Sequence, residues 1–271
     1  MSAVTRATRR RTVALGVWSG FALLYLFLPV FLIVAFSFND PSGRFNFTWQ
    51  GFTLDQWKDP FSVEGLGTAF RNSLEIAALS VVVSVILGTL VALALARYHF
   101  RGRSPLGLFL FLPLATPDVV MGASLLGLFL TMNVATGFAT ILIAHVMFNI
   151  AYVVVTVLAR LQGMDAHLEE AAMDLGANEW TTFRLVTLPL IAPGVAAAAM
   201  LAFVLSIDDY IVTSFNAGTT STFPLYIFGA ARQGVPPQVN VLATALLFAV
   251  VLLMVGNVAY QRRLARRDAA A

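Results

Sequence analysis

The chain has 271 residues, of which 59% are hydrophobic and only 11% are charged, and its formal net charge is +3. Since soluble domains carry about 25% charged residues, this composition indicates an integral membrane protein. There is no cysteine, which excludes disulfides and thiolate metal sites. Its three scattered histidines do not suggest a metal site. The basic residues cluster at predicted membrane edges, which argues against nucleic acid as a partner.

Six segments are long and apolar enough to cross a bilayer, which takes about 20 mostly apolar residues in a helix. They are residues 13–38, 70–96, 105–132, 136–159, 191–214 and 239–260. None alternates in the manner of a strand, and a helix satisfies its own backbone in lipid. We therefore expect an all-α membrane protein with six transmembrane helices in a single domain over residues 1–271.

Lysine and arginine predict the orientation of the spans. With the N-terminus in the cytoplasm, thirteen basic residues fall on the inner side and four on the outer side, which satisfies the positive-inside rule. The outer four are Arg44, Lys58, Arg71 and Arg232. An even number of spans then places both termini inside. The uncharged stretch 12–39 is longer than a signal-peptide core, so we expect an uncleaved anchor; a twin-arginine signal at residues 9–11 is the alternative.

The connections carry further predictions. The outer loop 39–69 is rich in aromatic residues, and residues 53–59 could form a short interfacial helix. The outer loop 215–238 is rich in proline and glycine, which predicts irregular structure. The inner loop 160–190 carries the most regular pattern, described next.

In this inner loop, residues 166–175 are good helix formers. Gly176 suits the positive φ at the end of a helix, and Asn178 can cap a second helix with Glu179 in its first turn. The apolar stripe of that second helix would be Trp180, Phe183 and Val186, and Pro189 and Pro193 would end it. The sequence therefore predicts helix, glycine turn and helix at the inner membrane face.

The residues Glu-Ala-Ala at 170–172, Gly176, Val186 and Leu188-Pro189 have the spacing E-A-A-x3-G-x9-I-x-L-P, with valine for isoleucine. This resembles the coupling loop of ABC-importer permeases. The resemblance implies the type I ABC importer permease fold, with cytoplasmic coupling helices that contact a separate ATPase. It assigns this contact to Glu170, Ala171, Ala172, Gly176, Glu179 and Arg184. The alternative is an interfacial helix pair with no partner.

The chain contains no G-x4-G-K-[ST] phosphate loop. We therefore expect ATP and Mg to be bound by the ATPase partner. This chain is then expected to be a translocation subunit without a catalytic residue, metal ligand or cofactor of its own.

Four acids lie in the predicted spans, where a carboxylate costs about 2.5–3.5 kcal/mol and usually faces a cavity or a partner. They are Glu75, Asp118, Asp208 and Asp209. Pro113 and Pro117 predict a kink before Asp118, where freed carbonyls and a carboxylate suit a cation.

On a continuous helix, Asp208 and Asp209 would point about 100° apart, and a cation would relieve their mutual repulsion. The alternative for each of the four acids is a structural role, such as pairing of Asp208 and Asp209 with Arg71 or Arg232.

Aromatic residues can add cation–π contacts to an ammonium group. The candidates are Tyr210, Trp49, Trp57 and Tyr152, with a membrane-interface belt as the alternative explanation. For His145 and Asn149, polar groups within spans, we expect helix–helix hydrogen bonds; pH sensing by His145 is the alternative.

The segment 206–215, which reads SIDDYIVTSF, resembles the fifth span of polyamine permeases, as do residues 223–228 and 234–244. Shorter matches lie at 49–52, 97–102 and 117–122. Together they cover nearly the whole chain and resemble C-type permease subunits of spermidine/putrescine importers. The resemblance assigns the substrate pathway to Asp118, Asp208 and Asp209, beside which Tyr210, Trp49 and Glu75 are candidates.

The resemblance also implies partners: a homologous second permease, two ATPase subunits and an extracytoplasmic substrate-binding protein that docks on the outer loops. It implies alternating access in a bacterial plasma membrane. One rival is an importer for another cationic or small polar solute. Other rivals are an ion-coupled secondary transporter, which often shows a repeat, and a scaffold without transport activity.

Overall fold

The computed structural model describes residues 3–43, 45–165 and 167–268. These residues are mainly helical and form no β-strand. One isolated antiparallel bridge joins Asn39 to Phe52. The chain divides into two compact units. The first unit comprises Met1–Glu64 and Ala230–Ala249, and the second comprises Gly65–Gly229 and Val250–Ala271. A single transmembrane domain over the whole chain stays a prediction.

The first unit contains α1 (Ala3–Phe36), α2 (Asp55–Lys58) and the beginning of α12 (Pro237–Asp268). Residues Thr12–Phe36 of α1 have a mean hydropathy of 2.4, as the first predicted span requires. The short helix predicted at 53–59 is confirmed by α2.

The loop after α1 is ordered around the fully buried side chain of Asn39. Its amide nitrogen donates to Asn46 Oδ1 at 2.7 Å and to the Thr48 carbonyl at 2.8 Å. Its amide oxygen accepts from the Gln50 backbone N–H at 2.8 Å. One side chain thus satisfies several loop groups that would otherwise be buried without partners.

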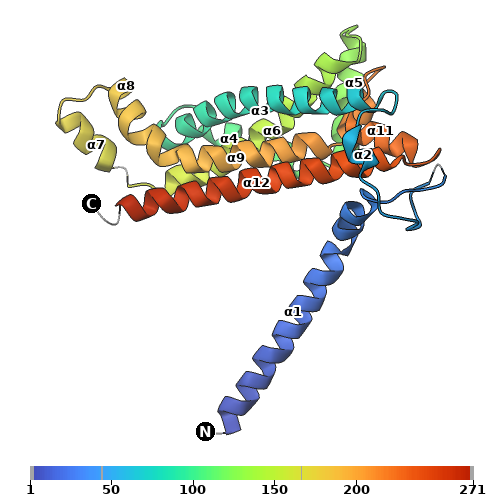
Figure 1. The fold of residues 1–271 in the computed structure, drawn as a ribbon. Helices are drawn as coiled ribbons and strands as arrows, with labels where there is room; N and C mark the ends of the chain where they lie inside the picture. The colour runs from blue at the N-terminus through green and yellow to red at the C-terminus, as the bar shows by residue number, and fades with distance from the viewer. Residues whose placement is uncertain (1–2, 44, 166, 269–271) are drawn as a thin grey trace. The chain divides into compact units, whose positions relative to one another are not determined.

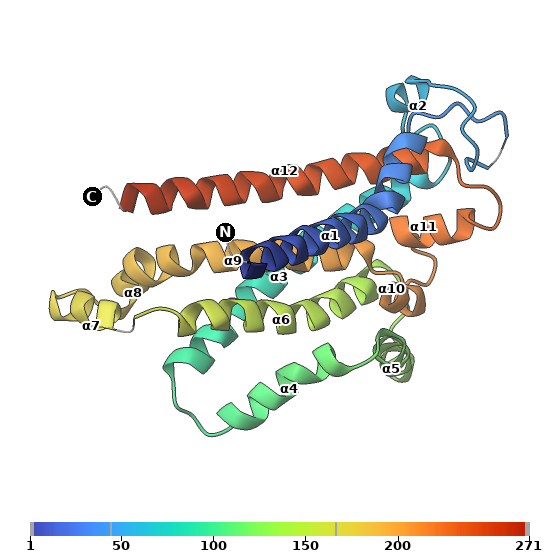
Figure 2. The same cartoon turned by 90° about the horizontal axis from the view of Figure 1, so that it is seen from below.

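The second unit is built on three long helices: α3 (Leu66–Arg97), α6 (Phe138–Gln162) and α9 (Leu188–Asp208). They pack side by side, as Figures 1 and 2 show. Their core is made mainly of alanine and β-branched residues, with two leucines: Ala92, Leu95, Val153, Val154, Val157, Leu161, Ile191, Ala198 and Ala202. Small residues allow close backbone approach, which is how helices associate in a membrane.

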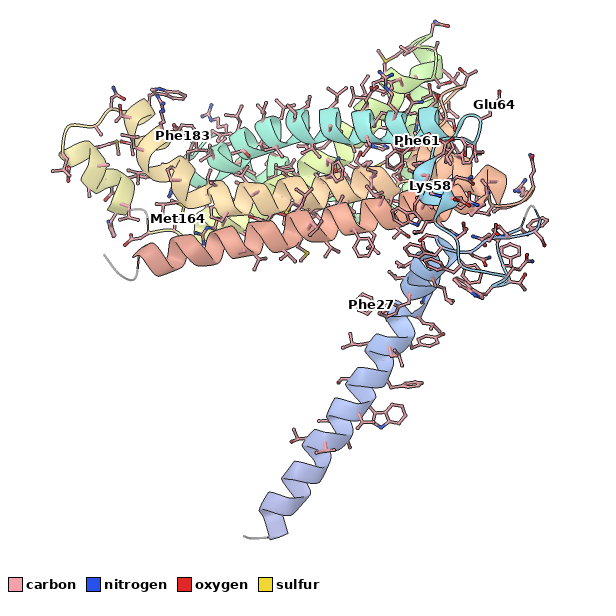
Figure 3. All side chains as sticks on the ribbon, in the orientation of Figure 1. Phe27, Lys58, Phe61, Glu64, Met164 and Phe183 are labelled. Carbon is pink, nitrogen blue, oxygen red and sulfur yellow. The ribbon has the colours of Figure 1, made fainter. Side chains whose placement is uncertain are left out.

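Shorter helices lie beside this three-helix bundle or at its two ends. They are α4 (Arg103–Ala115), α5 (Asp118–Thr131), α7 (His167–Asp174), α8 (Glu179–Thr182), the π-helix η1 (Phe183–Thr187), α10 (Ile211–Asn216) and α11 (Phe223–Ala230). Helices α7 and α8 lie at one end, and α5 and α10 at the other (Figure 2). Phe183 and Met164 mark the first of these ends in Figure 3.

Within the described residues, five helices are long and apolar enough to cross a membrane, and a sixth span results if α4 and α5 count as one. The predicted kink in this third span is confirmed as a complete break, because α4 and α5 are bent by 109°. The break falls at Thr116 and Pro117 (Figure 2). Proline lacks the backbone N–H needed to continue the ladder and disfavours helix in the residue before it.

Three further expectations are wrong. The predicted fifth span is not continuous to 214, because α9 ends at Asp208 and α10 begins at Ile211. The outer loop 215–238 is not irregular throughout, since it contains α11. Pro189 and Pro193 do not end the second coupling helix. Pro189 is the second residue of α9 and follows directly on the π-helical turn η1, and α8, η1 and α9 follow one another without a gap.

Close packing between α3 and α6 depends on Gly88. We therefore expect a larger side chain at this position to lower the stability of the protein. A Cβ atom at Gly88 would lie 2.6 Å from Val153 Cγ1, whereas one at Gly107 in α4 would meet nothing within 4 Å. Replacing glycine by alanine favours the helix by up to about 1 kcal/mol at either position. The difference in stability between the two variants therefore depends on packing. We expect Gly88→Ala to lower the thermal unfolding temperature in detergent and Gly107→Ala to leave it unchanged or raise it. Equal effects of the two variants would contradict this packing.

Candidate functional site

Two helix breaks meet around one pocket in the second unit. The pocket has a volume of about 490 Å³ and is lined by Pro113, Asp118, Met121, Phe148, Tyr152, Leu205, Asp208, Asp209, Tyr210, Ile211 and Val212. The first break separates α4 from α5, and the second separates α9 from α10. The structure therefore brings together Asp118, Asp208, Asp209 and Tyr210, four of the predicted pathway residues. Their role in transport stays a prediction.

Close packing of α5 on α10 holds the two breaks near each other. A Cβ atom at Gly122 would lie 2.7 Å from a ring carbon of Phe215 and 3.2 Å from the Val212 Cα. Met121, Leu125 and Phe129 of α5 share a buried cluster with Val212 of α10 and with Ala144 and Phe148 of α6. Glycine at 122 is thus what lets the two short helices touch.

Asp209 closes the second break by capping α10. Its carboxylate accepts hydrogen bonds from the backbone N–H groups of Val212 at 3.3 Å and Thr213 at 2.7 Å, and from the Thr213 hydroxyl at 2.7 Å. A helix start leaves N–H groups without partners, and at membrane depth no water replaces them. The expectation that Asp208 and Asp209 lie on one helix is wrong, because Asp209 has extended backbone angles.

Asp208 and Asp118 differ from Asp209 in their partners. Asp208 is the last residue of α9 and Asp118 the first of α5, and both side chains are exposed within the chain. In the described part of the chain, neither carboxylate has a hydrogen bond to another side chain or an ion pair. The predicted pairing of Asp208 with Arg71 is not found, since Arg71 Nε binds Glu75 Oε1 at 2.6 Å. Two carboxylates therefore face the pocket with their charges uncompensated.

Glu75 and Trp49 are not among the residues that line the pocket. Glu75 forms its ion pair with Arg71 one turn earlier on α3, which is the structural alternative for this acid. Trp49 belongs to the first unit, where its ring packs edge-on against Phe36 with 6.4 Å between centroids. Tyr210 does line the pocket, and its ring packs against Phe228 at 4.5 Å.

A buried chain of hydrogen bonds runs from the bundle core to Asp209. His145, only 2% exposed, contacts Ser206 Oγ through Nδ1 at 2.6 Å and Thr213 Oγ1 through Nε2 at 2.9 Å. Ser80 donates to Ser206 at 3.2 Å, and Asn149 donates to Ser80 at 3.4 Å. The predicted helix–helix hydrogen bonds of His145 and Asn149 are confirmed.

The direction of this chain follows from counting protons. The Thr213 hydroxyl donates to Asp209, so it accepts from His145, whose Nε2 must carry the proton. The same nitrogen lies 3.4 Å from Asp209 Oδ2. His145 thus acts by holding Thr213 toward Asp209. Sequence alone could not find this arrangement, because Ser80, Ser206 and Thr213 are ordinary residues in three different helices.

The predicted coupling residues lie at the opposite end of the second unit. Gly176 has a φ of +91° and ends α7 as predicted, with its N–H bonded to the Met173 carbonyl and that of Ala177 to the Ala172 carbonyl. Asn178 caps α8 by accepting from the Thr181 N–H at 2.8 Å, also as predicted. Helix, glycine turn and helix are therefore confirmed.

Most side chains of this segment are turned to solvent. Glu170, Ala171, Glu179 and Arg184 are exposed, and Ala172 is half-buried. Large apolar groups are exposed among them: Leu168, Met173, Leu175 and Trp180. Exposed apolar groups gathered on one segment mark an interaction surface.

Among the described residues, Glu170 pairs with a neighbour on its own helix. Its Oε2 lies 3.1 Å from Nδ1 of His167. This hydrogen bond, with the negative charges of Asp165 and Glu170, raises the pKa of His167 above its usual value. Both side chains are largely exposed, at 84% and 66%, so this pair contributes little to holding α7 in place.

Glu169, which the sequence analysis passed over, connects α7 to the bundle. Its Oε1 accepts from Arg97 Nη2 at the end of α3 at 2.9 Å and from the Thr187 hydroxyl in η1 at 2.7 Å. The Arg97 and Glu169 side chains are only 22% and 17% exposed, so this contact is screened far less than a surface pair. One carboxylate thus ties three elements together. In the sequence, Glu169 is marked only by its position directly before the Glu-Ala-Ala motif at 170–172.

Comparison with known proteins identifies the family. Residues 84–267 match the family model described as binding-protein-dependent transport system inner membrane component. The chain belongs to this family. It is 41% identical over 234 residues to the spermidine/putrescine transport system permease protein PotC of Escherichia coli K12, covering 86% of this chain and 88% of that protein. It is 39% identical to the putrescine transport system permease protein PotI of the same strain, covering 85% and 84%.

Solved structures agree on the fold. A bacterial ABC transporter that imports the acidic polysaccharide alginate matches with a TM-score of 0.66 at 18% identity, covering 95% of this chain and 97% of that chain. The MetNI methionine ABC transporter matches with a TM-score of 0.58 at 14% identity, covering 73% and 95%. The predicted type I ABC importer permease fold is confirmed. The named relatives are permease subunits rather than enzymes. This agrees with the expectation, drawn from the missing phosphate loop in this chain, that it is a translocation subunit.

Substitution of Thr213 tests the cap at the second break. Thr213→Val keeps the side-chain shape but removes the hydroxyl between His145 and Asp209, leaving buried polar groups unsatisfied at a cost of about 1–3 kcal/mol. Thr213→Ser keeps the hydroxyl. We expect Thr213→Val to unfold at lower temperature than Thr213→Ser in the same detergent. If the valine variant is the more stable, the hydrogen-bond chain does not hold the break.

Alanine variants of the two neighbouring glutamates test how α7 is attached. Glu169→Ala removes the acceptor shared by Arg97 and Thr187, and hydrogen bonds to charged groups are worth about 1.5–3 kcal/mol. We expect amides of α7 to exchange with deuterium about tenfold faster, since tenfold corresponds to about 1.4 kcal/mol. Glu170→Ala on the same helix is the control and should leave exchange unchanged. Equal acceleration in both variants would contradict the assignment.

Proposed function

We propose that this chain is a transmembrane permease subunit of an ATP-driven importer for polyamines such as spermidine and putrescine. The observation that carries the substrate class is the pocket at the two helix breaks, where Asp118 and Asp208 have no side-chain partner among the described residues. A polyamine carries several ammonium groups, and each unpaired carboxylate near 4 Å favours such a charge strongly in a low dielectric. The two relatives are named as permeases of spermidine/putrescine and putrescine transport systems, which supports the same substrate class.

The pocket suits this cargo in size and surface. Its volume of about 490 Å³ lies within the range of roughly 300–1,000 Å³ for small-molecule sites. Tyr152 and Tyr210 offer ring faces for cation–π contacts beside the carboxylates. We assign direct contact with the amines to Asp118, Asp208 and Tyr210. Asp209 lines the same pocket, but its carboxylate already caps α10, so we assign it to holding the break.

Energy for transport is supplied by an ATPase that binds ATP and Mg and contacts the exposed α7–α8 segment. We propose two copies of it, a homologous second permease and an extracytoplasmic substrate-binding protein as partners. One alginate transporter structure contains such a substrate-bound periplasmic protein. The basic residues support a bacterial plasma-membrane orientation with both termini in the cytoplasm. This orientation puts α7 and α8 on the ATPase side and the two helix breaks toward the outside.

Uptake by the reconstituted importer tests the substrate assignment. We expect Asp118→Asn and Asp208→Asn each to raise the KM for labelled spermidine at least about tenfold, the effect of losing about 1.4 kcal/mol of charge pairing. Glu75→Gln, which removes an acid paired with Arg71 outside the pocket, is the matched control. Wild-type KM in the double variant, with normal membrane levels, would overturn the polyamine pathway. Competition by amino acids but not by polyamines would favour another cationic or polar cargo.

The turn at Gly176 provides a separate test of coupling. Its φ of +91° is strained for any β-branched residue, while a Cβ atom there meets nothing within 4 Å. We expect Gly176→Val to lower transport per ATP hydrolysed without lowering assembly, because α7 can no longer keep its angle to α8. Gly127→Val, at a glycine without positive φ and with equal space, is the control. An unchanged transport-to-ATP ratio would contradict a coupling role for this turn.

A further inference from the structure

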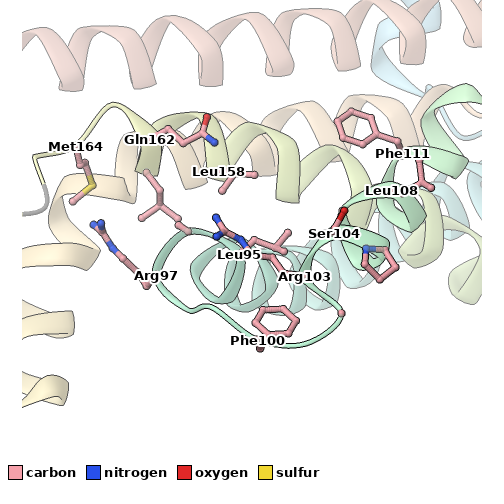
Figure 4. A pocket seen from close by; sticks show the side chains of 15 residues that line it. Leu95, Arg97, Phe100, Arg103, Ser104, Leu108, Phe111, Leu158, Gln162 and Met164 are labelled. Atoms are coloured by element: carbon pink, nitrogen blue, oxygen red, sulfur yellow. The ribbon is translucent and has the colours of Figure 1, made fainter.

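A second and larger cavity lies at the end of the bundle away from the helix breaks. Its volume is about 900 Å³, and it is formed by the end of α3, the connection to α4, the start of α4 and the end of α6. Figure 4 shows its lining, with Arg97 and Arg103 reaching it from opposite ends of the α3–α4 connection. Nothing in the transport pathway described above uses this cavity.

The charge of this cavity is one-sided. Its lining includes Arg97 and Arg103 and no acidic residue. Arg97 is held by Glu169. Arg103 is half-buried, and within the described residues its guanidinium has no ion pair or side-chain hydrogen bond. Ser104 and Gln162 add hydrogen-bond donors to the same lining. The polar part of the cavity is therefore complementary to an anion.

The rest of the lining is apolar and continues along α4. Leu108 and Phe111 both line the cavity and are 70% and 57% exposed. Helix α4 has no fully buried residue in the described chain. A small soluble anion would leave this apolar wall uncovered, whereas a molecule with an anionic head and hydrocarbon tails would cover both parts.

The position of the cavity along the membrane normal also suits a molecule with an anionic head and hydrocarbon tails. In the proposed orientation, the end of α3 and the start of α4 lie at the cytoplasmic surface of the membrane. Basic pockets between transmembrane helices at that level bind anionic lipid head groups. We propose that this cavity binds an anionic phospholipid of the inner leaflet, with its phosphate at Arg103 and its acyl chains along Leu108 and Phe111.

Native mass spectrometry of the complete importer tests this proposal. After exchange into dioleoyl phosphatidylglycerol or dioleoyl phosphatidylcholine, we expect wild type to retain more of the anionic lipid. Arg103→Gln should weaken that retention about fivefold, the effect of one basic residue worth about 1 kcal/mol near an anionic surface. Arg101→Gln is the matched control, because Arg101 is exposed on the same connection and does not line the cavity. Equal retention by Arg103→Gln and Arg101→Gln, or equal retention of both lipids by wild type, would overturn it.

A second variant keeps the test independent of arginine chemistry. Gly107 lines the cavity, and a Cβ atom there meets nothing within 4 Å, so Gly107→Leu fills the cavity without a backbone clash. It should lower phosphatidylglycerol retention as Arg103→Gln does; unchanged retention would contradict the site. Because the chain has no native cysteine, Ser104→Cys can carry a single photo-crosslinker. A crosslink to phospholipid supports the proposal, and a crosslink to the ATPase or the second permease instead would overturn it.

Discussion

Every helix that is interrupted within a membrane must satisfy its broken backbone from protein, because lipid offers no hydrogen bonds. In this chain, the Asp209 carboxylate meets that requirement at the α9–α10 break by accepting two backbone N–H groups of α10. The break in turn places Asp208 at a helix end rather than within a continuous ladder, and it turns Tyr210 and Ile211 into the pocket. The opposite break is made by Pro117, with Asp118 at the start of α5. The cap on α10 and the proposed cargo site are thus consequences of one arrangement.

The same arrangement connects the pocket to the coupling end. Glu179 to Asp208 form one membrane-spanning helical path, which begins at the cap of α8 and ends at the break. Its π-helical segment η1 lies where the path leaves the coupling region, and π-helical turns recur at functional sites. Thr187 at the end of η1 binds Glu169 of α7, which also binds Arg97 of α3. A push on α7 therefore acts on two of the three bundle helices at once.

Much of this could be predicted from sequence where a local rule applies. Positive φ at Gly176 and the cap at Asn178 follow from residue type and position alone. The break at Pro117 follows from proline chemistry, although its angle does not. The apolar lengths of the spans follow from the bilayer thickness.

What could not be predicted depends on contacts between distant segments. Nothing in the local sequence distinguishes Glu169 from Glu170, yet one is tied to Arg97 and the other faces solvent. Adjacent Asp208 and Asp209 look equivalent in sequence, but only Asp209 finds Thr213 and His145 in space. The second helix was expected to end at Pro189 because a proline interrupts a helix, whereas the helical path continues through Pro189 directly after the π-helical turn η1.

A structure of the assembled importer trapped with spermidine would test the central claim most directly. The account predicts ammonium density within hydrogen-bonding or ion-pair distance of the Asp118 and Asp208 carboxylates, about 2.7–4 Å, with Asp209 still bound to the start of α10. Cargo bound away from both breaks, or Asp209 released from α10 to hold an amine in place of Asp208, would contradict it.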